Sequence, residues 1–190
     1  QMDLERERGI TIKLAPVTMR YTSGGTEYQL NLIDTPGHVD FTYEVSRSLA
    51  AVEGALLLVD ATQGIQAQTV GNLHLAQEEG ITIIPVLNKI DVQGADLPKQ
   101  RSALAQFLGI TESEILLASG KSGVGVADLL EAVVKRVPPP RGKLEAPLRA
   151  LIFDSTYDDY QGVIAFVRIV DGAIRANCPI RFLGTGKEGK

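Results

Sequence analysis

The stretch Gly54-Ala-Leu-Leu-Leu-Val-Asp60 decides the fold of this chain of 190 residues. It is a continuous apolar run bounded by Gly and Asp, which is typical of a strand buried on both faces of a sheet. A helical pattern follows over residues 66–79 and stops at Gly80, and residues 81–87 form a second apolar run. A strand, a helix and a strand in this order predict a right-handed βαβ unit with parallel strands.

The alternation of strands and helices continues in both directions from this unit. Strand patterns cover three further segments: 10–21, 28–33 and 115–119. Helical patterns also cover three: 39–52, 96–108 and 126–137. The first two strand segments flank Ser23-Gly24-Gly25-Thr26 and predict a hairpin. The predicted fold class is α/β, with a mainly parallel sheet that carries helices on both faces.

Two loops carry local capping signals. Asp96 is placed to cap the helix over 96–108, with Pro98 in its first turn and Gly109 as its stop. Asp60 follows directly on a buried strand, and we expect its carboxylate to cap the next turn.

The run Pro138-Pro139-Pro140 ends the alternating pattern, since three prolines favour an extended linker. Beyond it, strand patterns at 148–153, 163–170 and 180–183 are separated by turns and contain no helix. We therefore predict an α/β domain over residues 1–143 and a β-rich domain over 144–190.

Composition excludes several classes of protein. Apolar residues make up 44% of the chain, too many for a chain that is disordered throughout, and no apolar run reaches the roughly 18 residues of a transmembrane helix. The net charge of −4 argues against a generally basic surface for nucleic acid. A single cysteine, Cys178, excludes an internal disulfide framework and suits a reducing compartment. The chain starts on Gln1, so we expect a piece of a longer protein.

Three strand ends carry unusual residues, and ligands of an open α/β sheet bind outside the carboxyl ends of its strands. Each motif alone is weak or moderate evidence: Asp before Pro-Gly is also common in turns, and Ser-Gly-Lys by itself indicates little. Together, in this order and after Gly9-Ile10-Thr11-Ile12, they indicate a nucleotide site. The three motifs are Asp34-Thr35-Pro36-Gly37-His38, Asn88-Lys89-Ile90-Asp91 and Ser119-Gly120-Lys121.

The second and third motifs suit a guanine base. Guanine presents two donors, N1–H and the exocyclic N2–H₂, and the carboxylate of Asp91 can accept both in a charge-assisted pair. Asn88 can satisfy the remaining purine edge or tether neighbouring loops. The methylene stem of Lys89 can cover the base and the ribose. The turn at Ser119-Gly120-Lys121 can give guanine O6 a backbone N–H.

The first motif suits the phosphates. Asp34 can hold Mg²⁺ through water, and Thr11 can place a hydroxyl on the same ion. Gly37 can bring a backbone N–H to the γ-phosphate at a point where a Cβ obstructs the approach. His38 then lies beside the line of attack and can orient the attacking water.

These motifs resemble switch I, switch II and the base-recognition motif of the translational GTPases. The longer stretches 2–13, 34–50 and 64–69, and the passage through Pro147 to Asp154, look like the LepA type, the back-translocating elongation factors. The resemblance covers essentially all of the chain. Elongation factor G and the BipA type share the switch motifs and fit residues 2–13 and 61–69 less well. The chain has Gly120 where the family usually has alanine, and a glycine keeps the needed N–H.

The resemblance implies GTP or GDP and Mg²⁺ as ligands, with hydrolysis of GTP during protein synthesis. Ile10 belongs to the hydrophobic gate beside His38, and Thr35 counts among the nucleotide-binding residues. Residues 1–143 are then a partial GTPase domain, and 144–190 the start of a β-barrel. The implied partner is the ribosome, not DNA, and no homo-oligomer is expected. The implied place is the cytoplasm of a bacterium or the interior of an organelle, and the resemblance leaves peripheral association with the inner membrane open.

A GTPase of this kind also uses G-x-x-x-x-G-K-[ST] to cradle the α- and β-phosphates. Gly120-Lys121-Ser122 lacks the first glycine, and 184–190 lacks the Ser or Thr and lies in the β-rich part. We expect that loop, and a strand between those ending in Asp34 and Asp60, outside these 190 residues. This chain alone is then expected to be inactive toward GTP. The alternative is a truncated, non-catalytic binding module.

Overall fold

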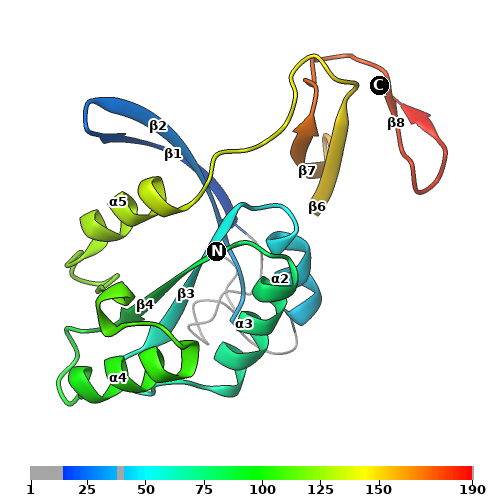
Figure 1. Ribbon diagram of the computed structural model, residues 1–190. Helices are drawn as coiled ribbons and strands as arrows, with labels where there is room; N and C mark the ends of the chain where they lie inside the picture. Colours follow the sequence, from blue (N-terminus) through cyan, green and yellow to red (C-terminus); the bar gives the residue numbers. More distant parts are fainter. Residues whose placement is uncertain (1–14, 38–40, 190) are drawn as a thin grey trace. The chain divides into compact units, whose positions relative to one another are not determined.

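The chain forms two compact units, residues 1–139 and 140–190 (Figure 1). We describe them from a computed structural model that covers residues 15–37 and 41–189. Ile10, Thr11 and His38 lie outside the described residues. None of the described helices has the length and apolar character needed to span a bilayer.

The first unit alternates strands and helices, as predicted. Its elements are β1 (Ala15–Ser23), β2 (Thr26–Asp34), α2 (Thr42–Leu49), β3 (Gly54–Asp60), α3 (Ala67–Glu78), β4 (Thr82–Asn88), α4 (Leu97–Leu108), η2 (Glu112–Glu114), β5 (Leu116–Leu117) and α5 (Val126–Arg136). Strands β3, β4 and β5 form a parallel sheet in that order. The strand predicted over 115–119 shortens to two residues, although Ile115, Ala118 and Ser119 are buried beside it.

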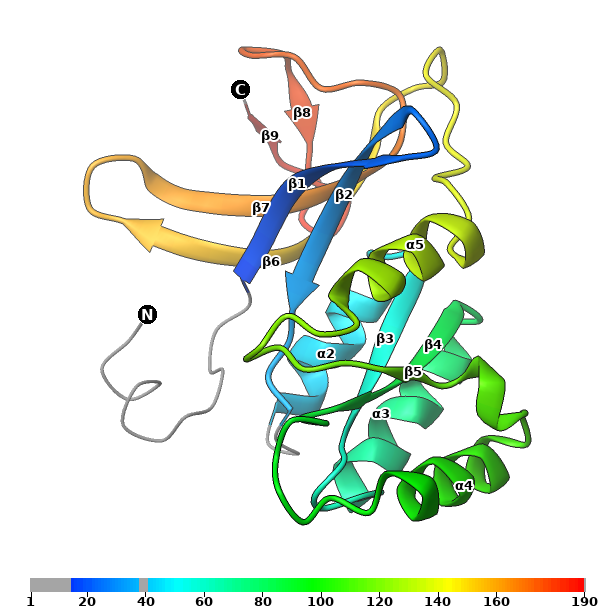
Figure 2. The same cartoon turned by 90° about the vertical axis from the view of Figure 1, so that its left-hand side faces the viewer.

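Helices cover both faces of the parallel sheet, because alternate residues of each strand point to opposite faces (Figure 2). On one face, Ile83 contacts the cluster formed by α2 and α3, and Leu87 packs against Leu104 of α4. On the other face, Ile84 and Val86 pack against α5. Ile84, Val86 and Leu87 are fully buried, so β4 is the centre of the core.

Helix α4 begins and ends at the predicted signals. The Asp96 carboxylate accepts a hydrogen bond from the N–H of Lys99 at 3.2 Å, and Pro98 lies in the first turn. Gly109 ends the helix in the left-handed region, with φ 68°.

Asp96→Ala should therefore lower the free energy of unfolding by about 1 kcal/mol, the usual cost of losing an N-cap. Urea unfolding followed by circular dichroism measures this loss. Asp96→Ser keeps an accepting oxygen and should lose much less. Equal losses in the two variants would show that the cap contributes nothing.

The β1–β2 hairpin turns through Gly24 and Gly25, whose φ angles of 56° and 82° fit the tight turns that twist with the strands. One carboxylate of α5 holds this hairpin: Glu131 accepts hydrogen bonds from the Tyr21 hydroxyl at 2.8 Å and the Ser23 hydroxyl at 2.9 Å. The hydrogen bond from Tyr21 lowers the pKa of Glu131 the most, and the bond from Ser23 lowers it further. The hairpin therefore lies beside α5 (Figures 1 and 2).

Strands β2 and β3 belong to separate sheets and share no ladder of hydrogen bonds within the described residues. Both carry apolar side chains that are unusually accessible: Leu32 is 45% exposed and Leu58 is 56% exposed. Such exposure is unusual for leucines in an α/β sheet, whose strands are normally covered on both faces.

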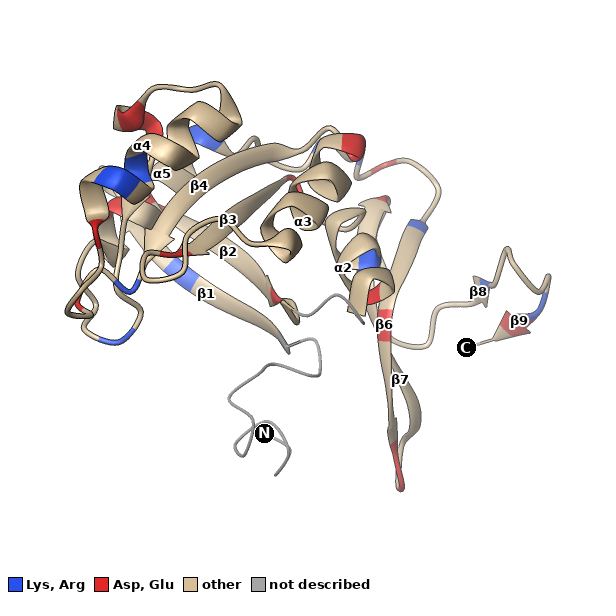
Figure 3. Cartoon of the chain, turned by 90° about the horizontal axis from the view of Figure 1, so that it is seen from below, with Lys and Arg blue, Asp and Glu red and all other residues tan. Residues whose placement is uncertain are grey.

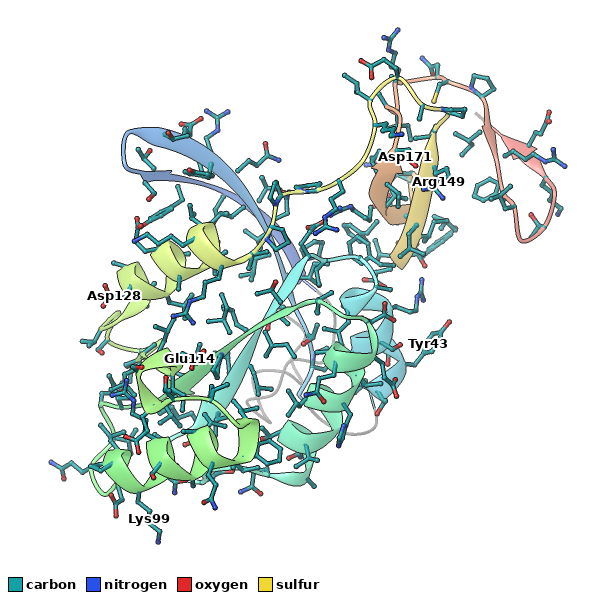
Figure 4. The ribbon with its side chains drawn as sticks, viewed as in Figure 1. Tyr43, Lys99, Glu114, Asp128, Arg149 and Asp171 are labelled. Carbon is teal, nitrogen blue, oxygen red and sulfur yellow. The ribbon has the colours of Figure 1, made fainter. Side chains whose placement is uncertain are left out.

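The second unit contains only strands among its described residues: β6 (Arg149–Asp158), β7 (Gly162–Asp171), β8 (Ile180–Arg181) and β9 (Glu188–Gly189). Both pairs are antiparallel. At one end of the long hairpin, Arg149 and Asp171 face each other (Figure 4) and form an ion pair at 2.6 Å. Asp171 also accepts the N–H of Lys143 at 3.0 Å, which fixes the incoming chain to β7.

Candidate functional site

The carboxyl ends of the parallel strands bring the predicted base-recognition motifs together. Asp60 of β3 is paired with Asn88 of β4, and Leu87 is paired with Leu117 of β5. The loops after β4 and β5 therefore start side by side. The structure places Asn88, Lys89 and Asp91 next to the turn that begins at Ser119.

Asn88 tethers these two loops. Its side-chain oxygen accepts the N–H of Lys89 at 2.8 Å and the N–H of Gly120 at 3.1 Å. Asn88 was expected either to bind the purine edge or to tether neighbouring loops, and the structure shows the tether. Its amide nitrogen is the group with which it can also reach a purine edge.

Ser119 links the turn to Asp91. It is fully buried, and its hydroxyl accepts the N–H of Ser122 at 3.0 Å. The hydrogen bond from this hydroxyl to Asp91, together with the carboxyl's own backbone N–H and the charge of Lys121, lowers the pKa of Asp91. Asp91 itself is exposed. It is an ionised acceptor, held in orientation and open to a ligand with two donors.

Lys89 reaches back across the sheet edge to Asp60, and its Nζ lies 2.6 Å from Asp60 Oδ2. The other oxygen of Asp60 accepts the N–H and the hydroxyl of Thr62, at 2.8 Å and 2.6 Å, which confirms the predicted cap. Partial burial works against ionisation of this carboxyl, but the bonds from Lys89 and Thr62 outweigh it and lower the pKa of Asp60 to about 2. The pair with Lys89 was not predicted.

The motif predicted to bind phosphate follows β2, in the other sheet. Asp34 is exposed at the end of this strand, Thr35 is half-buried and Pro36 is buried. Gly37 is exposed, and among the described residues no atom lies within 4 Å of the point where a Cβ would stand.

No group of three or more His, Cys, Asp or Glu side chains in the described part of the chain forms a metal cluster. Asp34 by itself offers an exposed carboxylate at the end of β2, the type of oxygen ligand that Mg²⁺ uses together with phosphate oxygens and water.

The family of the chain follows from comparison with known proteins. Residues 1–139 match the family model described as the elongation factor Tu GTP binding domain. The chain belongs to this family. The predicted α/β GTPase fold and the translational-GTPase resemblance are thereby confirmed.

The relatives of this GTP-binding domain include proteins named elongation factor 4. That of Chlorobaculum parvum is 57% identical over 188 residues, and that of Symbiobacterium thermophilum is 58% identical over the same length. Each match covers 98% of this chain and 31% of the relative. The chain thus spans about a third of the length of the curated relatives it matches, and the predicted LepA type is confirmed.

Two solved structures share the fold of this GTP-binding domain. A bacterial selenocysteine-specific elongation factor aligns with a TM-score of 0.79 at 23% identity, over 99% of this chain and 33% of that one. Translation elongation factor SelB of Methanococcus maripaludis, in complex with the GTP analogue GppNHp, aligns with a TM-score of 0.77 at 20% identity, over 94% of this chain and 40% of that one.

Proposed function

We propose that this chain supplies the guanine-recognition part of a translational GTPase of the elongation factor 4 type, and that the whole protein hydrolyses GTP during protein synthesis. The observation that carries the proposal is the joined pair of loops after β4 and β5. Asn88 binds Gly120 across them, and Ser119 orients Asp91. This arrangement presents an ionised carboxylate beside backbone N–H groups, which matches the donor pair and the O6 acceptor of guanine.

In this proposal each residue of the loops has a separate task. Asp91 accepts N1–H and N2–H₂ of the base and so selects guanine over adenine. The stem of Lys89 covers the base and the ribose. The N–H of Lys121 in the next turn faces O6, since the N–H of Gly120 is already bound to Asn88. Asn88 keeps the two loops at a fixed spacing.

The catalytic assignments rest on the predicted motifs. Asp34 and Thr11 hold Mg²⁺, which neutralises charge on the phosphates when it is bound. Gly37 and Thr35 contact the terminal phosphate, His38 orients the attacking water, and Ile10 belongs to the gate beside it. The exposure of Asp34 and Gly37 at the end of β2 supports this placement.

We also propose that a further strand and a phosphate loop of the whole protein lie between β2 and β3. The accessible Leu32 and Leu58 at this gap support the proposal. We further propose that the GTPase domain ends near residue 143 and that residues 144–190 form part of a β-barrel.

The ribosome is the proposed partner of the whole protein, in the cytoplasm of a bacterium or in an organelle. Basic and acidic residues are interspersed along the described part of the chain (Figure 3), and the net charge of the sequence is −4. Contacts with ribosomal RNA are therefore assigned to other parts of the protein. Sedimentation with ribosomes, and separately with anionic lipid vesicles, distinguishes this partner from a peripheral membrane site.

The test compares fluorescent GDP binding and GTP hydrolysis by the 190-residue chain and by a longer protein that contains it. The longer protein should bind and hydrolyse, and His38→Ala should lower its turnover by about 10²–10⁴-fold, the usual contribution of a group that positions or activates the nucleophile. The shorter chain should do neither. Turnover by the 190-residue chain that His38→Ala abolishes would contradict this assignment, and a longer protein without nucleotide affinity would favour a non-catalytic module.

A further inference from the structure

The ion pair between Lys89 and Asp60 joins the base-recognition loop to a strand end that carries no predicted ligand contact. Its N–O distance is 2.6 Å, and the Asp60 side chain is 18% exposed while that of Lys89 is 54% exposed. The two residues are 29 positions apart, yet they meet because Asp60 and Asn88 are register partners in the parallel sheet.

Asp60 is a rigid anchor rather than a mobile surface carboxylate. One of its oxygens accepts two hydrogen bonds from Thr62. Its backbone carbonyl accepts the N–H of Gln63 at 3.1 Å and that of Gly64 at 2.7 Å. The carboxylate is thus fixed in orientation before Lys89 reaches it, and the pair costs the ordering of only one side chain.

The backbone of Lys89 adopts a conformation that it would not take by itself. Its φ of 65° lies in the left-handed region, which costs a non-glycine residue free energy and persists where surrounding contacts impose it. Three contacts do so here: Lys89 donates its N–H to Asn88, its carbonyl accepts the N–H of Val92 at 3.1 Å, and its ammonium binds Asp60.

We propose that Asp60 is a positioning residue for Lys89, which holds the ammonium so that the methylene stem lies over the base and the ribose of the nucleotide. The inference rests on the proposed function, since it assigns a nucleotide to this edge of the sheet. A lysine ammonium has three N–H donors, so the bond to Asp60 leaves two for a ligand. The stem covers a face that all purines share, and Asp60 therefore adds affinity without adding base selectivity.

The test is the rate at which the full-length protein releases fluorescent GDP. Asp60→Asn replaces one carboxylate oxygen with an NH2 group, which cannot accept a hydrogen bond. The amide keeps one accepting oxygen, so it cannot hold Thr62 and Lys89 on separate oxygens as Asp60 does. Release should be about two- to fivefold faster, the range of a partly exposed ion pair. Inosine diphosphate, which lacks the exocyclic amine, should be released faster by the same factor, whereas a defect at Asp91 changes the ratio of the two nucleotides.

Two further variants separate positioning from a general loss of structure. Thr62→Val removes the hydroxyl bond to Asp60 but keeps the backbone N–H bond and the ion pair, so it should accelerate GDP release much less than Asp60→Asn does. In a Lys89→Met background, Asp60→Asn should cause no further acceleration, because the cation it holds is gone.

The outcomes distinguish the two proposals. If the wild-type full-length protein does not bind GDP, the proposed function is wrong. If it binds GDP and Asp60→Asn releases it at the wild-type rate, the positioning role is overturned while the function stands. Additive effects of Asp60→Asn and Lys89→Met, or equal effects of Asp60→Asn and Thr62→Val, also overturn it.

Discussion

Asp91→Asn in the full-length protein should weaken binding of GDP and GTP by about 10²-fold. The variant protein should also bind xanthosine nucleotides better than the wild type does. Each hydrogen bond from the base to the carboxylate is charge-assisted and contributes about 1.5–3 kcal/mol, so loss of one such bond already accounts for a factor of this size. The change in base preference follows because xanthine carries a carbonyl where guanine carries its exocyclic amine. The amide NH2 of asparagine can donate to that carbonyl, whereas the carboxylate of Asp91 cannot.

Competition between fluorescent GDP and unlabelled xanthosine diphosphate measures the change in relative affinity. Asp96→Asn is the matched control, since it removes the same charge from the same loop and keeps an N-cap that is about as good. Its relative affinities should equal those of the wild type. Relative affinities left unchanged by Asp91→Asn would remove this residue from base recognition.

Gly125→Ala should destabilise the first unit by about 3 kcal/mol or more. Gly125 precedes α5 with a φ of 74°, a conformation that costs an alanine about 1–2 kcal/mol. An added Cβ would also lie 2.0 Å from the carbonyl oxygen of Leu117, so the backbone of β5 or of the turn must move. Losses of this size come from strain and overpacking in the core.

Urea unfolding of Gly125→Ala and Gly123→Ala separates the two causes. Gly123 has a similar φ of 79° but no atom within 4 Å of its added Cβ, so this control should lose only about 1–2 kcal/mol. Leu117 lies two residues before Ser119, so the displacement that Gly125→Ala forces on the Leu117 carbonyl should also loosen the turn at Ser119. Equal losses would show that the contact with Leu117 relaxes without cost.

The fold could be predicted wherever a signal lies within one element or one turn. The apolar runs at 54–60 and 81–87 predict buried parallel strands, and β3 and β4 occupy almost the same residues. Asp96, Pro98 and Gly109 mark the ends of α4 because capping involves neighbours within four positions. The position of Asp91 could likewise be predicted, since carboxyl ends of parallel strands meet at one edge of a sheet.

Contacts between distant elements could not be predicted in the same way. Glu131 binds Tyr21 and Ser23 across separations of 110 and 108 residues, and no periodicity in the sequence connects them. The pair of Lys89 with Asp60 depends on the register of β3 and β4, because a slip of one strand by one residue would turn its side chain to the other face, away from its partner.

The sequence by itself determined the family, the βαβ order and the residues suited to guanine, because these depend on residue type and local spacing. Only the tertiary structure decided how those residues are held: Asn88 as a tether, Ser119 behind Asp91, and Asp60 beneath Lys89. Hydrogen bonds and ion pairs act over about 3 Å. Which distant groups come that close depends on strand register and helix packing, which arise only when the whole unit folds.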